Sequence, residues 1–252
     1  MSKSYIYLGG VIIYINIKDI NIHYKVEGNG KDIILLHGWG ANLNTFKGIS
    51  KYLKDNFKVY SLDLPGFGES VIGLPLTVEE VADIIHEFVN KLNINNPIIL
   101  GHSYGGRIGI VYASKYNVDK LVLVSSAGIK EKLTKRKQFK IKVYKFFKKH
   151  HINLNLGSKD YKDADVVKKE MLVKTVNQDL RKYMNKINTP TLLMYGENDK
   201  TTSVGMAKII NKEIKNSTLI ILDECGHFPY LDRPNYFLLI LNSFLMGDNN
   251  ED

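Results

Sequence analysis

Short apolar runs alternate with longer amphipathic stretches along most of this chain of 252 residues. A short apolar run bounded by turn residues indicates a buried strand, whereas apolar positions spaced three and four residues apart indicate a helix. Strands that alternate with helices form a mainly parallel sheet with helices on both faces, because right-handed crossovers join neighbouring parallel strands. We predict eight strands, at residues 11–17, 21–27, 32–38, 57–64, 97–103, 120–126, 189–198 and 217–226, and helices at 42–55 and 104–115.

Two local signals add detail to this pattern. The first two strands flank Lys18 and Asp19, and so close a spacing predicts an antiparallel hairpin. Thr77 and Glu80 form a capping-box pattern, in which each side chain bonds the backbone of the other residue, so a helix should begin there. The apolar face of that helix consists of Val81, Ile84, Ile85, Phe88 and Leu92.

The interval from residue 129 to residue 187 interrupts the alternation, because it is poor in strands, rich in lysine and helical in its apolar spacing. A chain of this length fits one large domain. The sequence therefore predicts one α/β core formed by residues 1–128 and 188–252, with residues 129–187 as a helical insertion.

The formal charge of +9 is concentrated in the insertion. Between Lys130 and Lys149, ten basic residues accompany one acidic residue, so this stretch alone accounts for the net charge. Only four of the 35 basic residues are arginine, whereas phosphate and base recognition favour the bidentate guanidinium. Nucleic-acid binding is therefore not predicted.

Apolar residues recur at helical spacing within the same basic stretch, opposite its lysines, at Phe139, Val143, Phe146 and Phe147. Three interpretations are open. The stretch is a lid helix with lysines in water, a helix that lies on a membrane surface, or a positive field that attracts anionic substrates.

Several features bear on location. No apolar run reaches the roughly 20 residues that span a bilayer. The apolar N-terminus is interrupted by Gly9 and Gly10 and lacks a small-residue cleavage site, so we interpret it as a strand and not as a signal peptide. The single cysteine, Cys225, cannot form an internal disulfide, and we expect a small apolar filler there. A cytoplasmic location is expected.

The heptapeptide LGHSYGG at residues 100–106 surrounds Ser103 with glycines, directly after an apolar strand and before a helix. This is the context of a nucleophile elbow, whose GxSxG pattern runs here from Gly101 to Gly105. A serine on so sharp a turn has strained backbone angles, and its neighbours two residues away must be nearly bare. Ser103 is therefore the candidate nucleophile.

A nucleophilic serine needs a base, and the base needs an acid that orients it. His227 follows the last predicted strand, and Asp199 follows the strand before it. The carboxyl ends of parallel strands share one edge, so both side chains should lie near Ser103. The chain order serine, aspartate, histidine is also the hydrolase order.

Two other carboxylates compete with Asp199 for this role. Asp63 precedes Ser103 and begins a Pro-Gly turn, which favours a structural function. Glu197 lies only two residues from Asp199 and is the minor alternative. The remaining histidines lack a carboxylate or cysteine cluster at ligand spacing, so neither a metal nor another cofactor is predicted. They include His37, His86, His102, His150 and His151.

These motifs resemble the α/β-hydrolase fold superfamily, close to its small capped esterase-like members, over nearly the whole chain outside the insertion. The resemblance implies that HGWG at residues 37–40 opens an oxyanion hole whose donors are the backbone N–H groups of Trp39 and Tyr104. Such donors are worth about 2.7 to 4 kcal/mol each. It also implies that DLPGFGES at residues 63–70 is a structural turn and that the insertion is a cap.

The resemblance implies a serine hydrolase that cleaves a small or medium acyl ester, with Ser103 as nucleophile, His227 as general base and Asp199 as the orienting acid. Related dehalogenases and epoxide hydrolases carry aspartate at the elbow, so serine favours acyl transfer. Three alternatives keep the fold: an aminopeptidase of the proline-releasing type, a carbon–carbon bond hydrolase, and a non-catalytic ligand-binding receptor. The residues expected to line the pocket for a small-molecule acyl substrate are Trp39, Tyr104, Phe147 and Phe228.

Overall fold

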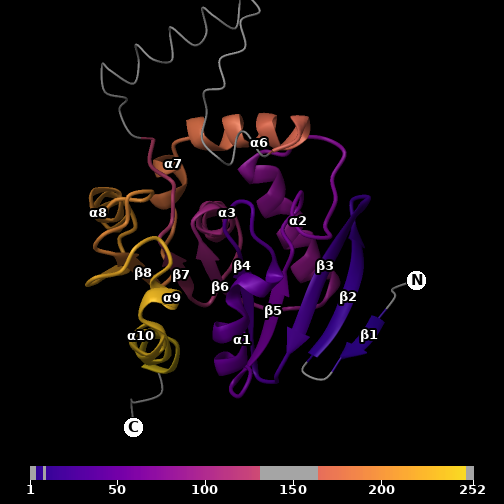
Figure 1. The fold of residues 1–252 in the computed structure, drawn as a ribbon, viewed down its shortest axis with the longest axis horizontal. Coiled ribbons are helices and arrows are strands. Elements are labelled where there is room, and N and C mark those ends of the chain that lie inside the picture. The colour runs from indigo at the N-terminus through magenta and orange to yellow at the C-terminus, as the bar shows by residue number, and fades with distance from the viewer. Residues whose placement is uncertain (1–3, 8–9, 131–163, 248–252) are drawn as a thin grey trace, which may run out of the picture.

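The computed structural model of the chain describes residues 4–7, 10–130 and 164–247 (Figure 1). One sheet of nine strands forms its centre, and helices cover both faces, so the predicted fold class is confirmed. All eight predicted strands are present, and the N-terminal stretch interpreted as strand contains a further one before them. The strands are β1 (Ser4–Tyr7), β2 (Gly10–Ile17), β3 (Ile20–Glu27), β4 (Lys31–Leu36), β5 (Phe57–Leu62), β6 (Ile98–His102), β7 (Leu121–Val124), β8 (Thr191–Gly196) and β9 (Ser217–Leu222).

The helices occupy the connections between these strands. The predicted helix at 104–115 is found at those residues, whereas the one predicted at 42–55 is a 3₁₀ turn followed by a shorter α-helix. The described helices are η1 (Leu43–Phe46), α1 (Lys47–Leu53), α2 (Val78–Lys91), α3 (Tyr104–Lys115), α6 (Val166–Asn177), α7 (Arg181–Met184), α8 (Val204–Glu213), α9 (Pro229–Asp232) and α10 (Pro234–Met246). Among the described residues, no helix has the length and apolar character needed to span a bilayer.

The strand order across the sheet is β1-β2-β3-β5-β4-β6-β7-β8-β9. The first four of these pair antiparallel, and every later neighbour pairs parallel. The predicted hairpin between β2 and β3 turns at Lys18 and Asp19, whose φ angles are both positive, 47° and 65°. Two positive φ angles are typical of the turn whose twist matches a two-residue hairpin. The parallel part of the sheet therefore runs from β5 to β9 and has a single carboxyl edge.

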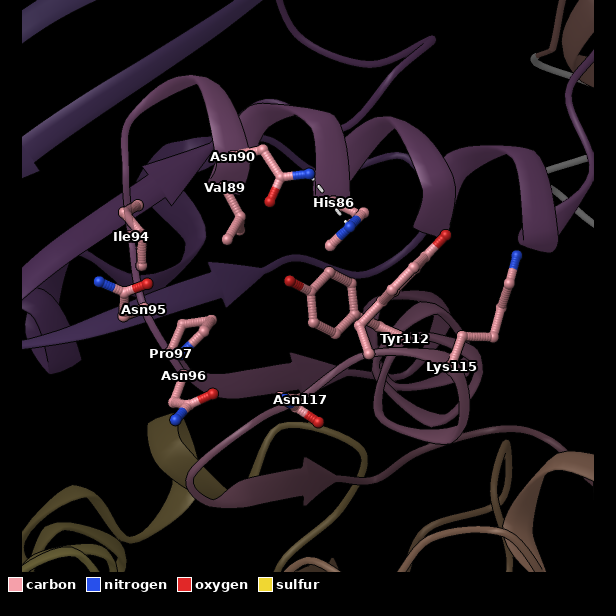
Figure 2. Close-up of a pocket in the computed structure, with 11 residues that line it drawn as sticks. His86, Val89, Asn90, Ile94, Asn95, Asn96, Pro97, Tyr112, Lys115 and Asn117 are labelled. Carbon is pink, nitrogen blue, oxygen red and sulfur yellow. Dashed lines mark hydrogen bonds between the residues drawn. The ribbon is translucent and has the colours of Figure 1, made fainter.

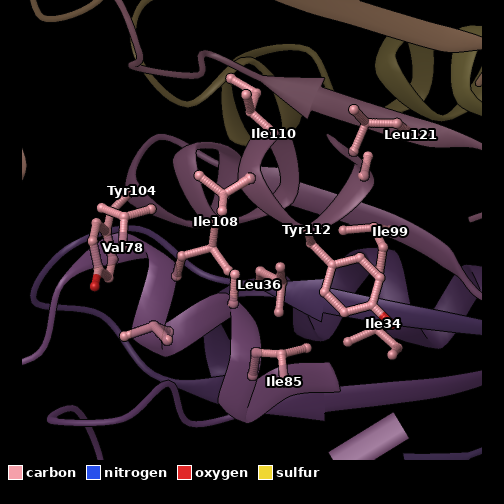
Figure 3. Packing of buried hydrophobic residues seen from close by; sticks show 14 of the residues in the cluster. Ile34, Leu36, Val78, Ile85, Ile99, Tyr104, Ile108, Ile110, Tyr112 and Leu121 are labelled. Atoms are coloured by element: carbon pink, nitrogen blue, oxygen red, sulfur yellow. The ribbon is translucent and has the colours of Figure 1, made fainter. Parts of the chain in front are cut away.

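Alternate residues of each central strand face opposite layers of helices. On β4, Ile34 and Leu36 lie in one hydrophobic cluster, and Ile33 and Leu35 lie in the other. The first cluster packs against α2, α3 and α8, and Figure 3 shows part of it. The second packs against α1 and α10. Both faces of the sheet are covered, which explains why its strands read as continuous apolar runs.

Helix α2 begins at the predicted capping box. The Thr77 hydroxyl accepts the Glu80 N–H at 3.2 Å, and the Glu80 carboxylate accepts the Thr77 N–H at 2.7 Å. The predicted apolar face is turned inward: Val81, Ile84, Ile85 and Phe88 are buried. The cap thus fixes where the helix starts, and burial fixes which face meets the sheet.

Asp63, directly after β5, is buried at the centre of a loop network. Its carboxylate accepts hydrogen bonds from His23 Nδ1 at 2.7 Å, from the Leu43 N–H at 2.7 Å and from the Glu69 N–H at 2.8 Å. Gly68 has a φ of +51°, and a Cβ there would lie 2.1 Å from the Asp63 carboxylate. Burial opposes ionisation of Asp63, but the bonds from His23, Glu69 and Leu43 outweigh it, so its pKa lies below its ordinary value.

We expect Asp63→Asn to lower the free energy of unfolding at pH 7 by about 3 to 5 kcal/mol. Asparagine removes the charge and keeps only one acceptor oxygen, so its NH2 group would face His23 or one of the backbone N–H donors in place of an acceptor. A carboxyl whose pKa is depressed by folding stabilises the protein fully above its unfolded pKa of about 3.9, and this stability is lost as the pH falls through the folded value. The difference between wild type and variant should therefore shrink below about pH 4. Urea denaturation at several pH values measures it.

The exposed Asp55 provides the matched control. Asp55→Asn should change the free energy of unfolding by no more than about 0.5 kcal/mol. An Asp63→Asn protein as stable as the Asp55→Asn protein at pH 7 would contradict the structural role of Asp63.

Candidate active site

Ser103 lies between β6 and α3, at the carboxyl edge of the parallel strands. Its φ of +51° and ψ of −105° place it in a conformation that non-glycine residues rarely adopt. The turn is held from both sides: the Ser103 N–H donates to the Val124 carbonyl at 3.0 Å, and the Ser103 carbonyl accepts the Arg107 N–H at 3.3 Å. A strained serine between a strand and a helix is the geometry of a nucleophile elbow.

The glycines around Ser103 are required by close backbone contacts. A Cβ on Gly101 would lie 2.4 Å from the Gly105 carbonyl oxygen, and a Cβ on Gly105 would lie 1.9 Å from that of Leu36 on β4. Gly106, outside the GxSxG pattern, is equally constrained, because its Cβ would lie 2.3 Å from Ser126 Oγ. The elbow is therefore packed directly on the two neighbouring strands.

Asp199 and His227 lie in contact on the loops after β8 and β9. His227 Nδ1 is 2.8 Å from Asp199 Oδ2, and the side chain of Asp199 is fully buried whereas that of His227 is 17% exposed. Burial opposes ionisation of Asp199, but hydrogen bonds from His227 and Thr202 outweigh it and hold its pKa far below the ordinary value. A permanently ionised carboxylate on Nδ1 favours the tautomer that leaves Nε2 free as a base.

Thr202 belongs to this carboxylate site, and the sequence reasoning missed it. Its hydroxyl lies 2.6 Å from Asp199 Oδ2, and the Thr201 and Thr202 N–H groups donate to Oδ1 at 2.7 and 2.9 Å. The same hydroxyl is 3.0 Å from the Ser125 carbonyl. A hydroxyl residue three positions after the candidate aspartate was the available signal, because such residues bond locally.

His102, the residue before Ser103, connects the elbow to the His227 loop. His102, adjacent to Ser103, places its Nε2 2.9 Å from the His227 carbonyl oxygen, and the two rings are 4.8 Å apart. No hydrogen bond joins Ser103 Oγ to the His227 ring among the described residues. Bonds between a nucleophile and its base are often long without substrate and tighten in the substrate complex.

The two expected oxyanion donors flank the elbow. In the described part of the chain, neither the Trp39 N–H nor the Tyr104 N–H donates to another protein group. Tyr104 is the first residue of α3, where helical N–H groups lack partners in the helix itself. A Cβ on Gly38 would lie 3.6 Å from Ser103 Cβ, so the loop that carries Trp39 touches the elbow.

Two hydrogen bonds of the His37 ring fix the loop that carries Trp39. Its Nε2 accepts the Leu64 N–H at 3.0 Å, so the ring proton is on Nδ1, which donates to the Gly38 carbonyl at 2.7 Å. Carbonyl and N–H point opposite ways across a trans peptide, so this bond directs the Trp39 N–H away from the ring. Burial lowers the pKa of His37 to about 4, which keeps the ring neutral.

The other residues expected to line the pocket fall in different environments. Trp39 is half-buried and its ring is 5.2 Å from the ring of Tyr104, which is only 2% exposed. Phe228 is 44% exposed and its ring is 5.2 Å from that of His227. Phe147 lies outside the described residues. Trp39 and Phe228 thus offer apolar surface beside the elbow and beside His227.

The alternative acids do not contact His227. Asp63 is bound to His23, as described above, and exposed Glu197 accepts the Glu224 N–H at 3.4 Å. Cys225 is fully buried in the cluster under α10.

The remaining histidines are accounted for by other contacts or lie outside the described chain. His86 stacks on Tyr116 with ring centroids 3.6 Å apart, whereas His150 and His151 fall in the part that the structure does not describe. Within the described ranges, no three His, Cys, Asp or Glu side chains converge on a position that could hold a metal ion.

A hollow of about 320 Å³ lies elsewhere, between the ends of α2 and α3 (Figure 2). Its lining includes His86, Asn90, Tyr112 and Asn117. The loops that line it lead into β6 and β7, so it opens at the amino edge of the sheet. It contains none of the candidate site residues.

Helix α6 lies across the end of the molecule above α2 and α3 in Figure 1. It approaches the loop after β5, since Met171 lies 3.8 Å from where a Cβ on Gly66 would be. Gln178, the residue directly after α6, accepts a hydrogen bond from the Arg107 guanidinium at its carbonyl, at 3.2 Å. Arg107 lies one helical turn after Ser103. The chain after residue 163 is thus anchored to α3. The boundaries of a cap at 129 and 187 remain a prediction, and its basic apolar stretch lies outside the described residues.

Comparison with known proteins gives one family. The family model described as alpha/beta hydrolase fold matches residues 32–149 and 158–234. The match includes the elbow, Asp199 and His227.

Three individual proteins illustrate the similarity. A pimeloyl-(acyl-carrier protein) methyl ester esterase of Wigglesworthia glossinidia brevipalpis is 28% identical over 90% of this chain and 98% of its own. The human monoacylglycerol lipase ABHD6 is 24% identical over 97% of this chain and 85% of its own. The solved structure of an esterase from Exiguobacterium antarcticum superposes with a TM-score of 0.76 and 24% identity, covering 92% of this chain and 98% of that one. At that identity the structural likeness shows the fold alone.

The glycine contacts predict a large effect of one methyl group. Gly105→Ala should lower the free energy of unfolding by at least about 3 kcal/mol, because the new Cβ overlaps backbone of β4 that cannot rotate away. Gly48 is the control, since a Cβ there meets no atom within 4 Å. Gly48→Ala should stabilise α1 by about 0.5 to 1 kcal/mol. Equal urea midpoints for the two variants would refute the packing argument.

The hydroxyl of Thr202 should contribute directly to the ionisation of Asp199. In Thr202→Val the pKa of Asp199 should rise toward its ordinary value by about 1 to 2 units, since a hydrogen bond to a charged group is worth about 1.5 to 3 kcal/mol. Thr202→Ser keeps the hydroxyl and should leave the pKa unchanged. Carbon NMR titration of the labelled carboxyl measures both, and indistinguishable titration curves would show that the hydroxyl has no such effect.

Proposed function

Because the chain belongs to the alpha/beta hydrolase fold family, we propose that it is a serine hydrolase that cleaves a small or medium acyl ester through an acyl-enzyme on Ser103. The observation that carries this proposal is the buried Asp199 in contact with His227 Nδ1 at 2.8 Å, on loops at the edge where the elbow lies. An ionised acid behind an imidazole is the arrangement that activates a serine hydroxyl.

In the proposed first step, Ser103 Oγ attacks the ester carbonyl carbon while His227 Nε2 takes the hydroxyl proton. Asp199 remains ionised and stabilises the imidazolium that forms. Its low pKa supports this role, because it cannot take the proton from His227 near neutral pH. The negative charge that develops on the carbonyl oxygen is met by the Trp39 and Tyr104 N–H groups, worth about 2.7 to 4 kcal/mol each.

In the second half of the reaction, the tetrahedral intermediate collapses and His227 returns its proton to the departing alkoxide, which leaves as an alcohol. A water molecule then attacks the acyl-enzyme with His227 again acting as base. The acid departs and Ser103 regains its proton. Apart from the attacking water, the proposed cycle uses only these side chains and backbone amides.

The named relative suggests which ester to test first. We propose a methyl ester of an acyl chain carried on an acyl-carrier protein, as in the name of the Wigglesworthia relative. Residues 164–187 carry six basic and three acidic side chains, so this part of the chain would attract a carrier with an acidic surface. Monoacylglycerol, the substrate named for the human relative, is the competing candidate.

Ser103→Ala should abolish hydrolysis of p-nitrophenyl acyl esters, with a loss of at least about 10³-fold in kcat, because only binding and the oxyanion donors remain. A fluorophosphonate should label wild type at Ser103 and leave the variant unlabelled. Ser114→Ala is the matched control and should keep full activity. Ser114 lies near the end of α3, the helix that follows Ser103, and its hydroxyl donates to the Val111 carbonyl.

The same assay should include carrier-linked methyl esters, monoacylglycerols and aminoacyl amides. A preference for amides would replace the esterase proposal with the aminopeptidase alternative. Retention of a tenth of wild-type activity by Ser103→Ala would reject Ser103 as nucleophile.

A further inference from the structure

We propose that His102 is a positioning residue for the reaction, which fixes the main chain of His227 relative to Ser103 by one hydrogen bond. The proposal rests on the proposed function, since it concerns the same site. His102 is the last residue of β6 and is only 2% exposed. It therefore belongs to the rigid sheet, whereas His227 lies on a loop.

The hydrogen bond determines which ring nitrogen of His102 carries the proton. Nε2 lies 2.9 Å from the carbonyl oxygen of His227, and a carbonyl oxygen can only accept. The proton is therefore on Nε2, and Nδ1 is a bare acceptor. The bond acts on the backbone of the general base and leaves the His227 ring free for its own chemistry.

The opposite side of the His102 ring lies against the loop of residues 37–40, which carries Trp39 and is called the oxyanion loop below. A Cβ on Gly38 would lie 2.8 Å from His102 Nδ1, and Nδ1 has no hydrogen-bond partner among the described residues. The ring thus fills the space between the oxyanion loop, the elbow and the His227 loop. It also contacts the rings of Phe228 and Tyr230, at 5.0 and 5.4 Å.

The unpaired nitrogen shows that shape alone does not explain a histidine here. Burying a polar atom without a partner costs free energy, and a phenylalanine would fill similar space without that cost. What phenylalanine lacks is the Nε2 donor. The bond to the His227 carbonyl is therefore the feature for which this side chain is suited.

His102 is not a second base. Burial, followed by the nearby charge of His227, lowers the pKa of His102 to about 4, so the ring is neutral at the pH where esters are assayed. Three smaller effects act on the same pKa. The hydrogen bond to the His227 backbone and the charge of Asp199 raise it, whereas His37 lowers it. Its protonated nitrogen is bonded to backbone and its bare nitrogen is covered by Gly38. It can orient the base and cannot replace it.

The test compares His102→Phe with His102→Gln, whose side-chain amide can still donate to the carbonyl. A displacement of about 1 Å at a reacting group costs about 10²-fold in rate. We expect His102→Phe to lower kcat and the rate of fluorophosphonate labelling of Ser103 by 10- to 100-fold with little change in KM, and His102→Gln to recover most of both. His86→Phe, at the amino edge, is the control and should change neither rate.

A double variant separates positioning from general damage. In a His227→Ala background, adding His102→Phe should not slow the labelling of Ser103 further, because the base that His102 positions is gone. A further tenfold loss there would overturn the proposal, as would equal losses for the Phe and Gln variants with equal melting temperatures.

Nitrogen NMR of the wild-type protein gives a readout that needs no variant. His102 should show a protonated Nε2 and an unprotonated Nδ1, with no titration between pH 5 and 8; the opposite tautomer would exclude the bond. The outcomes also distinguish the two proposals. Wild type that is not labelled at Ser103 rejects the proposed function, whereas normal labelling of both wild type and His102→Phe rejects only the role of His102.

Discussion

The close packing of the turn at Ser103 is the constraint on which the rest of the site depends. Backbone of β6, the start of α3 and the end of β4 approach so closely that a Cβ on Gly101 or Gly105 would overlap a carbonyl oxygen. That approach forces Ser103 into a positive φ and fixes its side chain at the carboxyl edge of the sheet. Because the neighbouring strands are parallel, their following loops reach the same edge, and the loop contacts described above become possible only there.

The second constraint is electrostatic and concerns one buried carboxylate. A fully buried aspartate is costly unless its oxygens are satisfied, and Asp199 receives two backbone N–H groups, the Thr202 hydroxyl and the His227 ring. The local loop thus stabilises the charge before any imidazolium forms. In the proposed reaction, this negative charge is already desolvated and oriented when His227 takes a proton.

How much of the fold and the site could be predicted from the sequence depends on how far apart in the chain the interacting residues lie. The strands, the capping box at Thr77 and the elbow at Ser103 depend on neighbouring residues, so periodicity and spacing were sufficient for them. The contact between Asp199 and His227 was accessible because parallel topology brings strand ends together. The pair of His23 and Asp63, and the bond from His102 to the His227 loop, join residues far apart in the chain with no shared motif. Only the packed fold shows them, and Thr202 was missed because its neighbour's burial could not be known.

The buried imidazoles explain why the proposed reaction assigns the role of base to only one of several histidines at this site. His37 and His102 are both neutral, with pKa values near 4, and each donates its single proton to a backbone carbonyl, from Nδ1 in one and Nε2 in the other. A charged ring at either position would oppose the imidazolium of His227, since like charges nearby disfavour the charged form. Burial removes that competition, and Asp199 contacts only His227 among the three. The desolvation that makes His37 and His102 poor bases therefore leaves Asp199 to interact with His227, the one ring that is partly exposed. His37 and His102 stay neutral and donate to backbone carbonyls of the loops on either side of Ser103.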